Sequence, residues 1–305
     1  MTAQSADPPL AIGVDIGGTR IKMGVVDDAG ALLATALVPT PRDPAELAAV
    51  VAEHVARLRT EIPSAAGAPV GAAAPGIVDE TAGTVALAVN LGWEDVPIRR
   101  LLSDALGAPV VLGHDVRAGA LAESRWGAGS RFDDGGLLFV PLGTGIAAAW
   151  VRDGRVQGDR FTGEIGQVRV RDPLTGASDR LERVAAASAI GRRYGEALPA
   201  GGAVPTDVVV DRARRGDELA ERIVFSALDT LAQALATVIS STGPVPVVIG
   251  GGLSDGGSLV LDGLAESLRF HLGVIPAPPV VPAVLGAWAG CRGAALLALE
   301  PQGTR

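Results

Sequence analysis

An internal repeat of short apolar runs and glycine turns constrains the fold of this chain more than any other feature. In the first part of the chain the runs and turns follow one another as 10–14, Gly17-Gly18-Thr19, 21–26, Asp27–Gly30 and 31–38. The order returns as 137–142, Gly143-Thr144-Gly145, 146–151 and Asp153-Gly154, so the second glycine turn begins 126 residues after the first. A repeated pattern of this kind predicts a duplicated α/β unit, and therefore two lobes with a cleft between them.

Apolar residues at helical spacing fill the intervals between these runs. The spacing predicts helices over 44–62, about 218–241 and 288–299, and we expect the last of them to return to the first lobe. Residues 246–249 read as a strand that ends in Gly250-Gly251-Gly252, whereas 199–205 and 276–282 read as loops. A chain of 305 residues is long enough to bury two modest cores.

Charge and cysteine content exclude several classes of protein. The net charge is −8 and there is no basic run, so the sequence predicts no binding to nucleic acid or to an anionic membrane. Met1–Pro9 do not resemble a signal peptide, and glycine, proline or serine interrupt the uncharged stretches 135–151 and 230–254, which favours buried elements over membrane spans. Cys291 is the only cysteine, which excludes an internal disulfide and favours a reducing cytoplasm.

Three glycine turns follow apolar runs and can bind phosphate through backbone N–H groups without any net positive charge. They are 15–19, 143–145 and 250–252. Each turn alone is weak evidence, but three of them fit a nucleotide in a cleft. None matches the Walker pattern, for which Lys22 is wrongly spaced. Asp15 is placed to hold Mg²⁺ through water, and its structural interpretation is a turn residue that bonds to its own backbone.

Three further carboxylates have both a structural and a chemical interpretation. Asp115 follows the apolar run 110–112 and precedes a helical pattern, so by itself it reads as a helix N-cap more than as a base. Glu164 lies in a glycine-flanked loop, where a solvated turn residue is expected. Glu182 reads as a surface carboxylate at a helix start.

The motifs taken together resemble the ROK family of bacterial sugar kinases and repressors. They are Asp15–Thr19, Ala74–Asp79, Asn90–Trp93, Asp115 with Ala118 and Glu123, Gly143–Ile146, Gly163–Gly166 and Ile249–Gly252. The resemblance runs in family order from about residue 12 to residue 299. It implies an actin-like (ribonuclease H-like) two-lobed α/β fold with duplicated βββαβα units, in which 1–115 and the C-terminal helix 286–305 form the small lobe and 116–285 form the large lobe.

The resemblance also implies an activity: transfer of the γ-phosphate of ATP, with Mg²⁺, to a hexose hydroxyl, O6 being the expected acceptor, in a cytoplasmic homodimer. Asp115 would be the general base, since a carboxylate must accept the proton of the attacking hydroxyl. The sugar would contact Asn90, His114, Asp115, Glu164, Gln167 and Glu182. ATP would be held by Asp15, Gly17, Gly18, Thr19, Lys22, Gly143, Thr144, Gly145, Gly250, Gly251 and Gly252.

The sequence departs from the family in three places. His114 stands where Asn is usual, and its imidazole can bond to a hydroxyl or pair with Asp115 and lower its basicity. Gln167 replaces a histidine. Many members bind structural zinc through that histidine and three cysteines, whose positions here hold Gln167, Pro173, Thr175 and Arg180. We therefore expect no zinc, and a pairing of Arg180 with Asp172 or Asp179 that contributes little to holding the loop.

Two other functions compete with a kinase for glucose or an amino or acylamino hexose. One is a sugar-responsive regulator, since the family includes repressors. Those carry a DNA-binding region ahead of the first strand, where this sequence has Met1–Pro9 and no basic patch. The other is a sugar-binding protein without catalysis. The presence of Asp15, Asp115 and all three turns favours the kinase.

Overall fold

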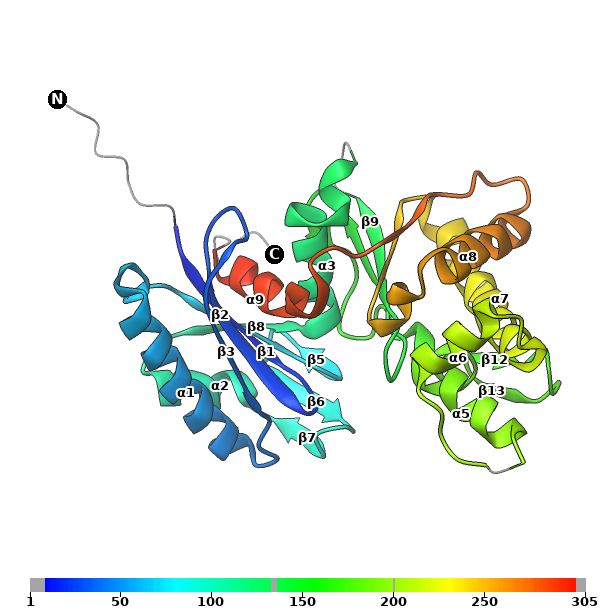
Figure 1. Cartoon of the computed structure of the whole chain (residues 1–305). Helices are drawn as coiled ribbons and strands as arrows, with labels where there is room; N and C mark the ends of the chain where they lie inside the picture. Colours follow the sequence, from blue (N-terminus) through cyan, green and yellow to red (C-terminus); the bar gives the residue numbers. More distant parts are fainter. Residues whose placement is uncertain (1–8, 133–135, 200, 300–305) are drawn as a thin grey trace. The chain divides into compact units, whose positions relative to one another are not determined.

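The computed structural model describes residues 9–132, 136–199 and 201–299. Of the segments interpreted above, residues 1–8, 135, 200 and 300–305 lie outside the described residues. The chain divides into two compact units (Figure 1). The first extends to Trp126 and includes Gly158–Phe161 and the chain from Ala287, and the second consists of Gly127–Gln157 and Thr162–Gly286. The sequence places the boundary at residue 115. The structure places the following helix in the first unit, because it packs against the C-terminal helix of that unit.

The first unit is built on a sheet with the strand order β3-β2-β1-β4-β8, in which β1 is antiparallel to β2 and parallel to β4. The strands are β1 (Ala11–Ile16), β2 (Arg20–Val26), β3 (Leu32–Pro39), β4 (Val70–Ala74) and β8 (Val110–His114). Helices α1 (Pro44–Glu61) and α2 (Ile98–Leu106) lie on one side of this sheet, and α3 (Asp115–Trp126) and α9 (Ala289–Leu299) lie on the other (Figure 1). The predicted strands at 10–14, 21–26 and 31–38 and the first and last predicted helices are confirmed.

Side chains of β1 alternate between these two layers, as in any strand. Ile12 and Val14 are fully buried in the core that includes α1. Gly13 and Asp15 face α9, and this alternation places one acidic side chain of the strand opposite the C-terminal helix. The hydrophobic pattern of β1 therefore also fixes the direction of its carboxylate.

Helix α9 approaches the sheet and α3 at backbone-to-backbone distance. A Cβ atom on Gly13 would overlap the carbonyl oxygen of Cys291, and one on Gly71 of β4 would overlap that of Ala294. On the opposite side of the helix, a Cβ atom on Gly293 would overlap the carbonyl oxygen of Ala118 in α3. Glycine is required at these positions because any side chain would push the helix away from its neighbours.

A small antiparallel sheet, β5-β6-β7, extends the first unit. Its strands are β5 (Ile77–Asp79), β6 (Thr84–Ala88) and β7 (Trp93–Val96). The turn from β4 into β5 passes through Gly76, whose φ of +88° and contact with the backbone of Leu87 exclude a side chain. This turn brings Val78, Asp79 and Glu80 toward the end of β8.

The second unit repeats the topology of the first. Its sheet has the order β11-β10-β9-β14-β15, again with an antiparallel neighbour on one side of the central strand and a parallel neighbour on the other. The strands are β9 (Leu137–Pro141), β10 (Ala149–Arg152), β11 (Arg155–Val156), β14 (Val247–Gly250) and β15 (Val280–Pro282). The predicted duplication is confirmed by this equivalence of order and direction.

Two details of the second sheet differ from the sequence prediction. The expected strand over 146–151 begins only at Ala149, because Ile146 forms a single bridge with Leu142 before the chain turns away. The segment 276–282 was expected to be a loop, but Val280–Pro282 form β15. The prolines make this segment resemble a loop in the sequence, but an edge strand tolerates proline where no ladder hydrogen bond is needed.

Helices and one hairpin complete the second unit. The hairpin is formed by β12 (Arg169–Arg171) and β13 (Ser178–Arg180), and the helices are α4 (Leu181–Ala185), α5 (Ala187–Ala197), α6 (Thr206–Arg214), α7 (Glu218–Thr242) and α8 (Gly257–Leu272). Within the described residues, α7 is the one helix with the length and hydropathy of a membrane span. Since 61% of its most apolar window is buried, it reads as a core helix.

The close approach of α9 predicts a strong effect of a single methyl group. Gly71→Ala should lower the free energy of unfolding by about 3 kcal/mol, because the added Cβ must displace the backbone of Ala294. Gly67→Ala is the control, since Gly67 is exposed and has no atom within 4 Å of its Cβ position. Urea unfolding of both variants measures the difference, and equal midpoints would contradict the packing described here.

Candidate active site

Asp15 is buried at the end of β1, where Lys22 of β2 faces it. The two residues are cross-strand neighbours, and Lys22 Nζ donates to Asp15 Oδ2 over 3.1 Å. Burial raises the pKa of Asp15, the charge of Lys22 opposes this, and the nearby Asp115 carboxylate adds to it. A Cβ atom on Gly290 of α9 would lie 2.8 Å from the Asp15 carboxyl carbon, so only glycine leaves room for this carboxylate. The side chain is therefore a strand residue paired with a lysine, and the alternative of a self-bonding turn residue is wrong.

The turn after β1 is closed by a hydrogen bond from Gly17 N to Arg20 O of 3.1 Å. Within the described residues, the N–H groups of Gly18 and Thr19 donate to no backbone acceptor. A Cβ atom on Gly18 would lie 2.9 Å from Nδ2 of Asn90, so the amide of Asn90 packs directly against this turn. The structure thus brings together Asp15, the first glycine turn and Asn90 in the first unit.

Asp115 begins α3 directly after β8, and its Oδ1 accepts the N–H of Val116 over 2.7 Å. Asp115 is thus the first residue of the helix and not its N-cap, since a cap accepts from N–H groups two or three residues further on. The carboxylate keeps a third of its side chain (33%) accessible, as a base requires. Burial raises the pKa of Asp115 to about 6, against the lowering effects of the Val116 N–H, Arg117 and Lys22. A carboxyl with a pKa close to neutrality suits proton transfer.

His114 lies beside Asp115 as a neutral imidazole. Its Nε2 is 3.4 Å from Asp115 Oδ1, and burial and then the charge of Arg117 lower the pKa of His114 to about 4, against the raising effect of Glu80. At neutral pH the histidine therefore carries no charge and does not stabilise the Asp115 anion as an ion pair would. Of the two roles open to His114 from the sequence, this favours the bonding of a hydroxyl.

Arg117 and Glu80 lie beside His114, Arg117 also acts on the base, and the sequence interpretation missed both. Arg117 is 8% exposed, and its Nε lies 3.1 Å from Glu80 Oε1, which also accepts the N–H of His114 over 3.2 Å. Arg117 Nη1 donates to Asp159 O over 2.5 Å. One sequence signal could have indicated Arg117: it is the single charged residue in the otherwise small or apolar run 116–122, which directly follows the base.

In the second unit, the two remaining glycine turns lie next to each other. β9 and β14 are parallel neighbours, and Leu142 N donates to Gly250 O over 2.9 Å. The first of these turns is closed by Gly143 N bonding to Gly145 O over 3.2 Å, and Ser188 Oγ donates to Thr144 O over 2.7 Å. Gly251 has a φ of +77° and lies against the backbone of Leu142. Parallel neighbours end at the same edge of a sheet, which is why turns far apart in sequence meet.

Glu182 and Gln167 also meet in the second unit. Glu182 lies in the first turn of α4, as expected, and Gln167 Nε2 donates to Glu182 Oε1 over 3.0 Å. A Cβ atom on Gly145 would lie 3.1 Å from Glu182 Oε2, so this carboxylate reaches the glycine turn. Glu164 precedes the 3₁₀ turn η3 (Ile165–Gln167), with its side chain half-buried.

The loop between Gln167 and Glu182 is held differently from the sequence expectation. Arg180 pairs with neither Asp172 nor Asp179. Its Nη1 lies 3.8 Å from Glu182 Oε1, while Asp179 pairs with Arg183 at 3.2 Å. Asp172 is buried with Arg193 at 2.8 Å, and a partner 21 residues away in sequence could not be inferred from local spacing.

The donor set around Asp15 fits a magnesium ion held mostly by its ligand and by water. Among the described residues, no three His, Cys, Asp or Glu side chains cluster as a metal site. Asp15 offers one carboxylate, which is what Mg²⁺ needs when phosphate oxygens and water complete its shell. The N–H groups of Gly18 and Thr19 next to it fit phosphate oxygens.

Comparison with known proteins agrees with this geometry. The model of the ROK family matches residues 11–301. A glucokinase of Streptomyces coelicolor is 33% identical over 96% of this chain and 98% of its own length. A ROK hexokinase structure from Thermus thermophilus has a TM-score of 0.80 at 34% identity, covering 95% of this chain and 97% of that one. A ROK glucokinase from Streptomyces griseus, solved with glucose and AMPPNP, has a TM-score of 0.77 at 30% identity and covers 95% and 99%. These likenesses confirm the predicted actin-like α/β fold.

The charge of Arg117 should be visible in the titration of its neighbours. Arg117→Met removes a cation that lowers the pKa of both Asp115 and His114, so both pKa values should rise above about 6 and about 4. NMR titration of the Asp115 carboxyl carbon and the His114 ring measures this. Arg125→Met on the exposed face of α3 is the control and should shift neither pKa. Unchanged or lowered values in Arg117→Met would contradict the charge arrangement.

Proposed function

Because the chain belongs to the ROK family, we propose that it is an ATP-dependent hexose kinase that transfers the γ-phosphate to O6 of glucose or of an amino or acylamino hexose. The observation that carries this proposal is Asp115. Its carboxylate has a pKa of about 6 and lies in the same unit as the Asp15 glycine turn. A base of this strength, near a turn suited to phosphate, matches what phosphoryl transfer to a hydroxyl requires.

Bound ATP with Mg²⁺ would supply the phosphoryl group and neutralise the charge on its oxygens. In the first unit, Asp15 would hold the metal through water, and Gly17, Gly18, Thr19 and Lys22 would hold the phosphates. In the second unit, the turns Gly143–Gly145 and Gly250–Gly252 are the proposed nucleotide contacts. Lys22 keeps a quarter of its side chain (25%) accessible while it pairs with Asp15, so its charge is available to a phosphate.

The residues around Asp115 prepare it to accept a proton. Oδ1 is fixed by the Val116 N–H, which leaves Oδ2 as the atom for the proton of the sugar hydroxyl. His114 is neutral at pH 7, so it can hydrogen-bond with a hydroxyl without carrying the charge that would weaken the base. Arg117 and Lys22 lower the pKa of Asp115 and so keep the carboxylate ionised near neutral pH.

The proposed sugar contacts of the first unit are Asn90, His114 and Asp115. Those of the second unit are Glu164, Gln167 and Glu182. Gln167 donates one amide hydrogen to Glu182, so its carbonyl oxygen is available to accept from a sugar hydroxyl. A carboxylate such as Glu164 can accept from two neighbouring hydroxyls and so fix which one reacts. We also propose a cytoplasmic homodimer, which the relationship to glucokinases supports. The net charge of −8 supports the proposal that the protein binds neither nucleic acid nor anionic membranes.

The proposal predicts hexose-dependent release of ADP from Mg-ATP. Asp115→Asn keeps the shape of the side chain and the bond to Val116 but removes the base, so kcat should fall by about 10²- to 10⁴-fold while the sugar still binds. A coupled ADP assay and calorimetry measure the two quantities. Asp104→Asn, at a surface pair of α2 with 69% exposed side chains, is the control and should keep full activity. Sugar binding without hexose-dependent ADP release by the unmodified protein would favour the non-catalytic alternative.

The pH dependence follows from the same carboxyl group. The base must be ionised, so kcat/KM should fall about tenfold per pH unit as the pH drops below about 6, and should level off above it. His114, with a pKa of about 4, adds no second step near neutrality. The residual activity of Asp115→Asn should lack the acidic limb. A profile that stays flat down to pH 5 would contradict the assignment of Asp115 as the base.

A further inference from the structure

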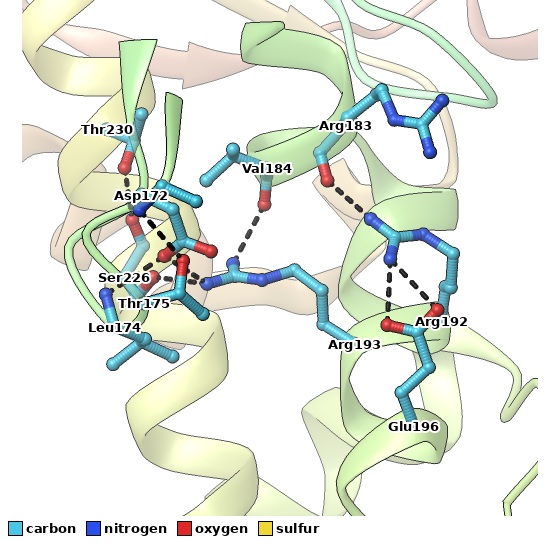
Figure 2. A network of polar contacts seen from close by, with 11 residues as sticks. Asp172, Leu174, Thr175, Arg183, Val184, Arg192, Arg193, Glu196, Ser226 and Thr230 are labelled. Carbon is cyan, nitrogen blue, oxygen red and sulfur yellow. Dashed lines mark hydrogen bonds and ion pairs between the residues drawn. The ribbon is translucent and has the colours of Figure 1, made fainter. Parts of the chain in front are cut away.

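One buried guanidinium, that of Arg193 in α5, joins three elements of the second unit (Figure 2). Its Nη2 donates to Asp172 Oδ1 over 2.8 Å and to Ser226 Oγ of α7 over 2.9 Å, and its Nη1 donates to Val184 O of α4 over 2.9 Å. The side chains of Arg193 and Asp172 are only 9% and 11% exposed. Burial lowers the pKa of Arg193 and the Asp172 charge opposes this, as in a pair that compensates its own desolvation.

The Asp172 end of this contact is the turn of the β12–β13 hairpin. Asp172 Oδ1 also accepts the N–H of Leu174 over 2.9 Å, and Asp172 O accepts the N–H of Gly176 over 2.8 Å. The residues from Pro173 to Ser178 are exposed. A two-stranded hairpin with so little apolar burial is marginally stable by itself, so it depends on anchors to the rest of the unit.

The other end of the hairpin carries two of the proposed sugar contacts. Gln167 precedes β12 and Glu182 follows β13, and Leu181 N bonds to Val168 O over 2.8 Å between them. Glu182 lies in α4, the same five-residue helix whose Val184 carbonyl binds Arg193. Arg193 therefore hydrogen-bonds to both the turn of the hairpin and the helix that carries Glu182.

We propose that Arg193 is a positioning residue for sugar recognition: by holding Asp172 and Val184 together it orders the hairpin and helix that present Gln167 and Glu182. This inference rests on the proposed function for the identity of the ligand, but the anchoring itself does not. Misplacement of hydrogen-bonding groups by such a lost support typically costs a factor of ten or more in binding or rate.

The kinetic test compares the KM for the hexose with the KM for ATP. Arg193→Met should raise the KM for the hexose about tenfold and leave the KM for ATP and kcat within about twofold. Arg193→Lys should restore part of the loss, because lysine keeps the charge for Asp172 but lacks the planar fork that also reaches Ser226 and Val184. Asp172→Asn should raise the hexose KM by less than Arg193→Met, because it weakens only one of the three contacts of Arg193. The double variant should be no worse than Arg193→Met.

Arg215→Met is the matched control. Arg215 follows α6 in the same unit and pairs with Asp211 over 2.8 Å, and their side chains are 78% and 48% exposed. Arg192 is unsuitable as a control, because its Nη2 donates to Arg183 O of α4 over 2.7 Å (Figure 2). Exposed pairs contribute little, so Arg215→Met should retain the kinetic constants of the unmodified protein.

Trypsin provides a readout that does not depend on kinase activity. Arg169, Arg171 and Arg180 are exposed cleavage sites within the hairpin. Loss of the anchor should speed cleavage there about tenfold in Arg193→Met, less in Arg193→Lys, and not at all in Arg215→Met, as followed by fragment masses.

The outcomes separate the two proposals. Unchanged hairpin cleavage in Arg193→Met and Arg193→Lys overturns the anchoring role, and faster cleavage with an unchanged hexose KM overturns the positioning role. A rise in both KM values together with a comparable fall in kcat in folded Arg193→Lys also overturns it, because that pattern indicates general damage. If the unmodified protein phosphorylates no hexose, the proposed function fails, and the cleavage rates still decide whether Arg193 holds the hairpin.

Discussion

The close approach of α9 to β1, β4 and α3 is the constraint on which the first unit depends. Gly13, Gly71 and Gly293 allow backbone to touch backbone, and a Cβ atom at any of them would overlap a carbonyl oxygen. The same helix presents Gly290 to the Asp15 carboxylate. Because α3 is packed through Ala118 on the other side of α9, the start of α3 and therefore Asp115 are positioned by the same contact.

This packing brings two carboxylates into a region where each has few compensating charges. Burial raises the pKa of both Asp15 and Asp115, and the negative charge of Asp115 adds to the effect on Asp15. Lys22 acts on both groups and Arg117 acts on Asp115. A bound cation would relieve this repulsion, which supports the proposed binding of Mg²⁺ at Asp15.

In the second unit, polar contacts bring together residues that are distant in the sequence. The glycine turns at 143–145 and 250–252 meet because β9 and β14 are parallel neighbours. The hairpin between Gln167 and Glu182 is tied to α5 and α7 through Asp172 and Arg193 (Figure 2). In both cases the turn or the charged side chain can be recognised in the sequence, but the fold determines which distant residue it contacts.

The sequence by itself determined the duplicated unit, most of its strands and the long helices, because hydrophobic period and glycine turns are local signals that burial directly enforces. It also identified Asp15, Asp115 and the three glycine turns as candidates. Only the tertiary structure decided that Asp15 pairs with Lys22, that Glu80 pairs with Arg117 beside His114, that Arg193 pairs with Asp172, and that 280–282 form an edge strand. Those outcomes depend on burial and on partners up to 37 residues apart, such as Glu80 and Arg117, and no local pattern specifies which charged side chain is excluded from water.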